Sequence, residues 1–436
     1  MSTEALQLEE PLKEGGIRSV NFFNGRLLTS KDLSREQQAR RAWDSRLGQA
    51  IGDGVAFGLD AARDGDLDTA AAPVLRVKAG LAVNRAGQTL RLSVDTSVAL
   101  TRRFDAASGT ACDCVFANCN PLADGTYVAG AGVYLLTIAP AQLSEGRAPT
   151  NGLDPSNVRC NTDVTVNGLQ FRLLSINPQR YADLDTGSPQ FRNRLAYRCF
   201  GIDARDATLI DPARDDPPSY GLIDELRAIG GRLSDCDVPL ALVYWTAQGL
   251  RFVDAWAVRR RLIEPDALRG LSFQARARRL VEADAMCAQF QAQLADLLAA
   301  SVSPGAVIAT EHFRHLPPFG MVPLLQSTLR GFSDEVFFSG LVRRPLAGQN
   351  QQTEFIDGRL LGVLRDEALR YTPVDTSLKE FVWVYRPWQI RQALDAGRNV
   401  QPVVVFASGL MPNHALARFD MARADLSNYA SCRGTC

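Results

Sequence analysis

A long stretch of apolar residues at helical spacing, from Pro265 to about Ala300, constrains the fold of this 436-residue chain more than any other feature. At about 1.5 Å per residue, one helix over this stretch would be on the order of 45 Å long, which is enough to separate two folded bodies. Gly270 can kink or split it, because glycine weakens a helix interior. A chain of this length also exceeds the size at which a single hydrophobic core stops growing. We therefore expect two or three domains and a long connecting helix within residues 261–302.

On both sides of this helix, apolar residues recur with a period of two, which predicts β-strands. Before the helix, strands are expected at 74–78, 81–83, 89–94, 98–100, 113–117, 127–138 and 165–176, followed by a hairpin at 239–245 and 251–258. A polar loop is expected at 60–72 and a short helix at 221–233. After the helix, strands are expected at 335–341, 354–363, 381–385 and 403–407, with short helices at 390–396 and 415–426.

These patterns predict a β-rich α+β protein. Its expected parts are a short N-terminal helical segment (1–60), an antiparallel β domain (61–260), the long connecting helix (261–302) and a mixed C-terminal domain (303–436).

The N-terminal segment combines a turn, a helix cap and a helix in a fixed order. Asn24-Gly25 is a typical turn dipeptide, Thr29 or Ser30 can cap the helix that follows, and Asp32 lies near the positive end of the helix dipole. Along the helix, one ladder of apolar residues suits a hydrophobic core: Trp43, Leu47 and Ile51. Four arginines on the same helix suit either a polar interface or solvent alone: Arg35, Arg40, Arg41 and Arg46.

This segment resembles the opening of proteins encoded with phage-tail-like contractile injection systems, which look like baseplate-associated or fibre-like structural parts. The likeness covers residues 17–60. Its motifs are Asn-Phe-Phe-Asn-Gly-Arg-Leu-Leu-Thr at 21–29, Asp32-Leu33, Glu36-Gln37 and a final Gly-x-Gly-Val-x-x-Gly-Leu at 52–59. Fainter likenesses lie at 145–149 and 194–199. Many relatives carry a His and a Trp near residues 52–55, where this chain has neither. We therefore expect a shared structural role and not a shared chemical one.

The resemblance implies that the chain is a structural component that docks at a baseplate or forms a fibre-like attachment, without enzymatic activity. Its partners would be baseplate or other particle proteins and further copies of itself, with a trimer as the expected form. It would be assembled in the cytoplasm and then belong to a particle that is released or attached to a surface. The implied docking segment has these interface residues: Asn21, Phe22, Phe23, Asn24, Gly25, Arg26, Arg35, Arg40 and Trp43.

Charge and hydropathy exclude several other classes of partner. The 48 basic and 48 acidic residues balance, which argues against an overall nucleic-acid footprint or a bulk attraction to anionic membranes. The N-terminus lacks the basic start and apolar stretch of a secretory signal. The longest uncharged run, 125–144, contains Gly130 and Pro140 and alternates like a buried strand, so no transmembrane segment is expected.

The nine cysteines leave a second hypothesis open. An odd count without a secretory signal favours reduced thiols, and Cys199, Cys236 and Cys287 stand in apolar surroundings, where cysteine acts as a small hydrophobe. Four others could hold a structural zinc ion, although their spacing is not the paired Cys-x2-Cys form: Cys112, Cys114, Cys119 and Cys160. The alternative function is thus a zinc- or carbohydrate-dependent enzyme or binding module, with a sugar cleft near 383–388. A third hypothesis is an anchoring protein with 203–220 as its tether.

The remaining motifs support no catalytic site. Asp64, Asp66 and Asp68 resemble the start of a calcium loop, but its sixth position is Thr69 and its twelfth is Leu75, so a solvated turn is expected. His312 and His315 are three residues apart and close to Pro317, which favours a structural role at a helix end. Cys432 and Cys436 could close a small disulfide loop. No phosphate loop or nucleophile elbow is present.

Overall fold

The computed structural model describes residues 15–70, 72–100, 130–146, 163–201, 221–228, 233–262, 275–326, 328–344, 354–378 and 381–408. The fold is mixed α+β with several antiparallel sheets, as the sequence predicts. The strand expected at 113–117 and the helix expected at 415–426 lie outside the described residues. None of the described helices is long and apolar enough to cross a membrane.

The N-terminal part contains helix α1 (Ser30–Ile51) and two small antiparallel sheets. The first sheet joins β1 (Gly54–Gly58), β4 (Gly80–Val83) and β5 (Thr89–Leu92), and the second joins β2 (Ala61–Arg63), β3 (Val74–Val77) and β6 (Thr96–Ala99). Strand β2 lies within the loop expected at 60–72, because Ala61–Arg63 pairs with Leu75–Val77. Residues 61–63 therefore form a strand, and the prediction of a loop was wrong there.

The third sheet has the order β10-β9-β7-β8, and its central strands are largely buried on both faces. Its strands are β7 (Gly132–Glu145), β8 (Val164–Ile176), β9 (Val238–Thr246) and β10 (Gly249–Asp254). Alternate residues of β7 enter different cores, Val133 and Leu135 on one side and Tyr134 and Leu136 on the other. Helices α2 (Phe191–Cys199) and α4 (Leu222–Ala228) cover the first face, and the two small sheets cover the second.

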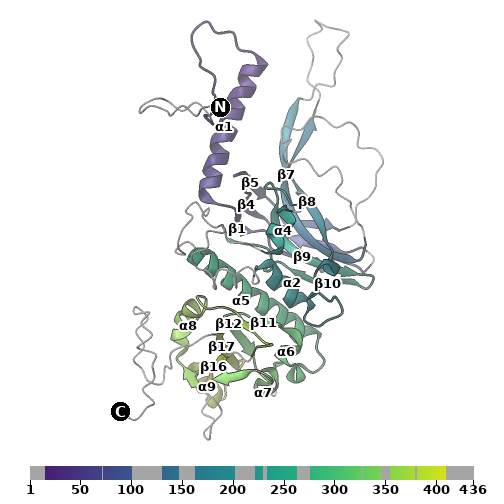
Figure 1. Ribbon diagram of the computed structural model, residues 1–436, viewed down its shortest axis with the longest axis vertical. Coiled ribbons are helices and arrows are strands. Elements are labelled where there is room, and N and C mark those ends of the chain that lie inside the picture. The colour runs from purple at the N-terminus through teal and green to yellow at the C-terminus, as the bar shows by residue number, and fades with distance from the viewer. Residues whose placement is uncertain are drawn as a thin grey trace, which may run out of the picture.

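Helix α5 (Ala275–Ala300) lies across the middle of the molecule, between the N-terminal sheets and the C-terminal part (Figure 1). Its residues enter the cores on both sides: Ala285 and Met286 pack with α2 and α4, whereas Phe290 and Leu294 pack with the C-terminal sheet. This placement corresponds to the connecting helix expected from the sequence. The stretch that contains Gly270 lies outside the described residues.

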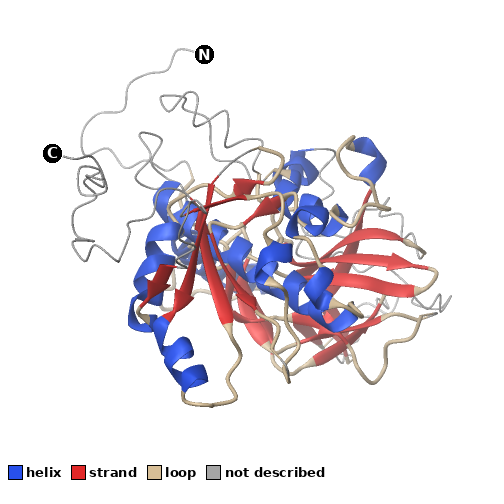
Figure 2. Cartoon of the chain, turned by 90° about the horizontal axis from the view of Figure 1, so that it is seen from below, coloured by secondary structure: helices blue, strands red, loops and turns tan. Residues whose placement is uncertain are grey.

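The C-terminal part is built around one mixed sheet of order β12-β17-β16-β13, with β14 also paired to β16. The strands of this part are β11 (His315–Leu316), β12 (Phe319–Pro323), β13 (Val342–Arg344), β14 (Glu354–Ile356), β15 (Val374–Asp375), β16 (Phe381–Pro387) and β17 (Val403–Ser408). Its helices are α6 (Ala309–His312), α7 (Asp334–Phe337), α8 (Leu361–Ala368) and α9 (Trp388–Asp395). Figure 2 shows the helices and strands of the whole chain, with helices lying beside strands.

Two strand predictions for this part were wrong. Residues 335–341 contribute to helix α7 and the turn after it, and only Glu354–Ile356 of the stretch 354–363 is a strand, because α8 begins at Leu361. In both places the apolar run is short, and the spacing of so few apolar residues does not distinguish a buried helix from a strand. The strands at 381–385 and 403–407 and the helix at 390–396 are confirmed.

Candidate interaction surface

Helix α1 projects from the small sheets (Figure 1). A close contact between two glycines holds its C-terminal end. A Cβ atom added to Gly48 would lie 2.9 Å from Gly87 Cα and nearer still to the Gly87 carbonyl oxygen. Gly87 also has a φ of +79°, which glycine adopts without strain. The absence of both side chains therefore lets the last turns of α1 rest directly on the β4–β5 turn.

At the other end of α1, a preorganised turn precedes the helix. The Arg26 N–H donates to the Phe23 carbonyl, and Gly25 supplies the positive φ of +91° that this turn needs. Thr29 is the N-cap and forms a capping box with Asp32, which confirms one of the two caps that the sequence allows. The turn and cap are thus fixed by local hydrogen bonds, as the order of residues predicts.

Arg26 links the turn to the helix. Its guanidinium donates to the Asn21 carbonyl at 2.8 Å and to Asp32 Oδ1 at 2.6 Å, and it lies over the Phe23 ring with 5.9 Å between Cζ and the ring centroid. Hydrogen bonds from the Thr29 hydroxyl and backbone N–H, together with Arg26, lower the pKa of Asp32 to about 2. One arginine therefore keeps the turn in a single shape.

Large apolar side chains are exposed along this whole segment. Of the twenty large hydrophobic residues that are exposed in the described part of the chain, nine lie between residues 22 and 57: Phe22, Phe23, Leu27, Leu28, Leu33, Trp43, Leu47, Ile51 and Phe57. Leu27 is 90% exposed. A concentration of this kind on a projecting element is typical of a surface that a partner covers, because single exposed hydrophobic residues are ordinary but clusters are not.

The prediction that the ladder of Trp43, Leu47 and Ile51 packs into a core was wrong. Trp43 is 62% exposed and Leu47 is 65% exposed. Other positions of the helix pack instead: Gly48 has no side chain and allows its backbone to approach Gly87, and Ala39 is buried. The apolar ladder is consequently left at the surface.

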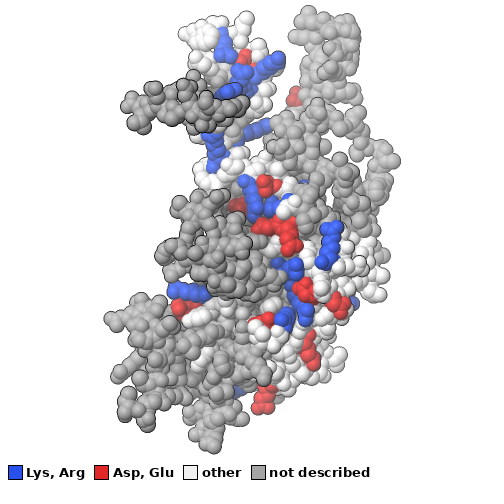
Figure 3. Space-filling model, viewed as in Figure 1, with Lys and Arg blue, Asp and Glu red and all other residues white. Residues whose placement is uncertain are grey.

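The segment is also basic, in contrast to the neutral chain as a whole. Residues 15–52 contain seven Lys or Arg residues and three Asp or Glu residues. Figure 3 shows Lys and Arg side chains gathered on α1 at the top of the view. Of the predicted contact residues, Arg35 is exposed, and the Arg40 side chain is 79% exposed and lies 3.7 Å from Glu36. Arg41 is half-buried, and Arg46 donates to the Gly15 carbonyl and lies over the Trp43 ring.

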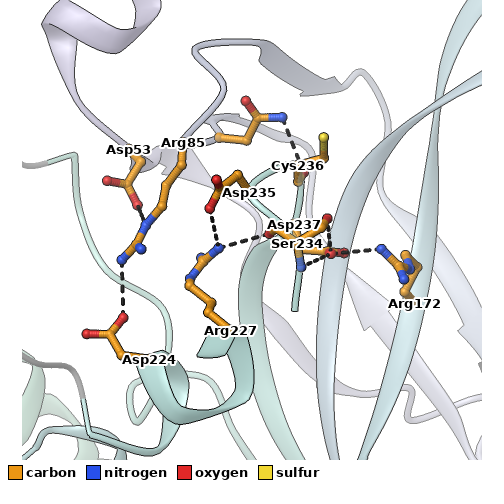
Figure 4. Close-up of polar contacts among 10 residues, drawn as sticks. Asp53, Arg85, Arg172, Asp224, Arg227, Ser234, Asp235, Cys236 and Asp237 are labelled. Carbon is orange, nitrogen blue, oxygen red and sulfur yellow. Dashed lines mark hydrogen bonds and ion pairs between the residues drawn. The ribbon is translucent and has the colours of Figure 1, made fainter. Parts of the chain in front are cut away.

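An ion-pair network fixes the base of α1 to the rest of the protein. Figure 4 shows Arg85, from the β4–β5 turn, between Asp53 at the end of α1 and Asp224 on α4, at 3.4 and 3.3 Å. Burial opposes the charge of Arg85, but the two carboxylates raise its pKa above the ordinary value. Beside it, Arg227 of α4 donates to the Ser234 carbonyl and lies 3.4 Å from Asp235. The projection and α4 are therefore joined through charged side chains that surround one turn.

The same region contains a buried carboxylate with all its acceptors in use. Asp237 accepts hydrogen bonds from Arg172 on β8 at 2.7 Å, from Thr137 on β7 at 2.9 Å, and from both the backbone and hydroxyl of Ser234. The Arg172 and Asp237 side chains are 11% and 0% exposed. Figure 4 shows this pair beside Cys236, whose carbonyl accepts a hydrogen bond from the Asn84 amide. Asp237 thereby holds the loop before β9 against the third sheet.

The cysteines proposed as zinc ligands, Cys112, Cys114, Cys119 and Cys160, lie outside the described residues, as do Cys432 and Cys436. Within the described part of the chain, no three His, Cys, Asp or Glu side chains are grouped as a metal site. Cys199 and Cys287 are free and buried, as expected, and burial raises the pKa of both thiols to about 12. Cys236 is buried too but is disulfide-bonded, so the expectation of a reduced thiol was wrong there.

The two histidines have separate surroundings. His312 ends α6, and its carbonyl accepts a hydrogen bond from Gln293, while burial lowers the pKa of its imidazole. The His315 ring stacks on Tyr197 with 4.9 Å between centroids, and its backbone pairs with the Asn193 side chain. These contacts join α2 to the C-terminal part.

Near the aromatic residues considered for a sugar cleft, Tyr385 is buried and Trp383 half-buried. Trp388 is exposed and packs edge-on against Phe355 at 5.3 Å. The two strand aromatics thus face the core to different degrees, and Trp388 lies at the surface.

The acidic motif at 64–68 forms a turn, but it is not solvated as expected. Asp64 is 2% exposed and accepts hydrogen bonds from the backbone N–H groups of Asp66 and Leu67 and from the Ser97 hydroxyl. The Ser97 hydroxyl and the Asp66 N–H lower the pKa of Asp64. The buried Asp64 carboxylate therefore stabilises the turn by accepting hydrogen bonds from its backbone.

No protein-family model matches this sequence, and no curated protein is significantly similar to it.

Sequence reasoning missed several residues that shape the surface. Leu27 and Leu33 were not included among the contact residues, and nothing in their local sequence distinguishes an exposed leucine from a buried one. The Gly48–Gly87 contact and the Arg85 network join residues far apart in the chain. Only Gly48, a glycine inside a predicted helix, could have indicated a close backbone approach from the sequence.

Proposed function

We propose that this protein is a structural component of a phage-tail-like contractile particle, and that it docks through residues 21–29 and the start of α1 at the baseplate or as a fibre-like attachment. The observation that carries the proposal is the cluster of exposed apolar side chains on a preorganised projection. The motif at 21–29, which resembles the opening of such components, forms the tip of that projection.

The chemistry of the turn suits a protein partner. Phe22 and Phe23 offer aromatic surface, and Arg26 keeps the turn ordered before binding, so little conformational entropy is lost on docking. The positive charge of residues 15–52 favours a partner surface that is apolar at its centre and acidic around it. In this role the protein acts through contacts and carries out no turnover. It would be assembled in the cytoplasm and carried as part of the particle.

The proposal is tested by sedimentation of contractile particles from the organism that encodes the chain. The unchanged chain should pellet with the particles, whereas a variant with Phe22→Ala, Phe23→Ala and Leu27→Ala should remain in the supernatant. The matched control is Leu325→Ala with Leu378→Ala, which removes exposed leucines from the C-terminal part and should pellet normally. Equal sedimentation of both variants, or no sedimentation of the unchanged chain, would contradict the proposal.

A further inference from the structure

We infer that α1 pivots as a rigid helix about Gly52 and Asp53, and that residues 85–87 of the β4–β5 turn form a latch that holds it in the observed orientation. The inference concerns this chain alone and does not rest on the proposed docking function. A pivot there changes the direction of the tip at residues 21–29. Because α1 has 22 residues and is therefore about 33 Å long, a rotation of about 10° at its base moves the tip by about 6 Å.

The pivot lies where the chain leaves the helix. Gly52 is the C-cap of α1, with a φ of 103° and a ψ of 172°, a conformation that is open almost only to glycine. The next residues are fixed to the body, because the Val55 N–H donates to the Arg260 carbonyl at 2.7 Å. A Cβ atom on Gly54 would lie 2.9 Å from the same carbonyl oxygen. A change in the direction of α1 therefore has to take place at Gly52 and Asp53.

Few side chains of α1 are buried above this pivot. Of its 22 residues, all of them described, only Ala39 and Gly48 are buried. Trp43 and Leu47 are more than half exposed. Segments with few buried apolar contacts open at a lower free energy than the core of a protein does. The orientation of α1 consequently depends on the contacts at its base.

The latch contacts the base of α1 through each of its three residues. The contacts are Arg85 with Asp53 at 3.4 Å, Ala86 with the side chain of Gln49 at 3.5 Å, and the Gly87 backbone with Gly48. The first two are polar contacts between partly exposed groups, which are individually weak. The latch can therefore open without unfolding the sheets.

The latch itself is attached to the body and not to the helix. Figure 4 shows Arg85 between Asp53 and Asp224, and the second of these carboxylates belongs to α4 and lies 3.3 Å away. The Ala86 N–H donates to the Asp235 carbonyl, in the loop before β9. Residues 85–87 thus stay with the body when α1 moves, and the contacts that break are those between the latch and the helix.

The test is double electron–electron resonance on the full chain, with one nitroxide at Gln38 of α1 and one at Leu67 in the turn before β3. Both positions are exposed. The labels are attached through a keto amino acid, so the native cysteines need no change. The unchanged chain should give one narrow distance, because the latch is closed.

Variants of the latch and of the pivot should shift this distance. In Gly87→Ala the new Cβ would overlap the Ser45 carbonyl oxygen, which is backbone, so a second distance should replace the first. Gly52→Ala should also shift the distance, because alanine rarely adopts the conformation of Gly52. Arg85→Ala removes only the ionic contact with Asp53 and should populate the second distance less than Gly87→Ala does. An unchanged distance in both glycine variants would overturn the inference.

A second pair of labels, at Lys31 and Ala50, separates pivoting from unfolding of α1. These exposed positions lie about 28 Å apart along the helix axis, and this distance should stay the same in every variant. The matched control is Gly397→Ala, at a glycine with a φ of +70° and no atom within 4 Å of its added Cβ, which should change neither distance. Broadening of the distance within α1, or an equal shift in the control, would overturn the pivot.

Discussion

A single methyl group at Gly48 tests whether α1 is held by close backbone contact. In a helix without neighbours, Gly→Ala stabilises by roughly 0.5–1 kcal/mol, because glycine has more conformational entropy to lose. Here the new Cβ would approach Gly87 Cα to 2.9 Å, whereas carbon atoms ordinarily keep about 3.5–4.0 Å. The obstructing atoms are backbone, which cannot rotate away. Overpacking of this kind costs about 1–3 kcal/mol, so the net expectation for Gly48→Ala is a loss of about 1–2 kcal/mol.

Hydrogen exchange at residues 45–58 and 84–90 measures this loss locally. Because about 1.4 kcal/mol corresponds to a tenfold change in an equilibrium, exchange through local opening should rise about tenfold in Gly48→Ala. The matched control is Gly362→Ala in α8, where a Cβ meets no atom within 4 Å. Exchange in α8 should slow in that variant. If Gly48→Ala also slowed exchange in α1, the close contact at the base would be refuted.

Three further predictions concern the buried and capped groups. Asp237→Ala leaves the Arg172 charge without its main partner and should lower the free energy of unfolding, measured by chemical denaturation, by about 3–5 kcal/mol. The control Asp395→Ala breaks an exposed pair with Arg391 and should lower it by about 0.5 kcal/mol or less. Equal losses in the two variants would contradict this prediction. The pKa of Asp32 is lowered from 3.8 to about 2, so its contribution to the N-terminal cap should be complete above pH 3.8 and be lost as the pH falls toward 2. An NMR titration should show this midpoint, and Thr29→Ala should move it up toward 3.8; an unchanged midpoint would contradict the capping box. Cys199 and Cys287 should resist alkylation at pH 8 in the folded protein, because their pKa values near 12 and their burial leave little thiolate, and mass spectrometry after brief labelling would detect a failure.

Local features of the fold were predictable from the sequence, because neighbouring residues determine them. The Asn24-Gly25 turn and the Thr29 cap need only residues within one helical turn of each other. Strand β7 was readable as a buried strand because both of its faces are apolar and enter different cores, which gives an uncharged, apolar run. Helix α2 was missed because Arg192 and Asn193 are polar but buried, where they pair with Asp254 and with the His315 backbone.

Features of the surface were less predictable, because they depend on what packs against each face. Trp43, Leu47 and Ile51 have the spacing of a core ladder, but in the structure α1 packs through other positions, among them Gly48, and leaves them exposed. Aspartate is usually a surface residue, but the fold buries Asp64 and Asp237 and surrounds both carboxylates with hydrogen-bond donors. A pattern of residue types indicates which face of a helix is apolar, but it does not tell whether this chain or another one covers that face.

The most direct test of the docking function is photo-crosslinking from the tip of the projection. A photoreactive amino acid in place of Phe23 should link the chain, within purified contractile particles, to a different protein that itself sediments with those particles. The same residue in place of Leu378 should give no such product. Crosslinks from position 23 that join only residues of this chain would contradict docking through the N-terminal turn.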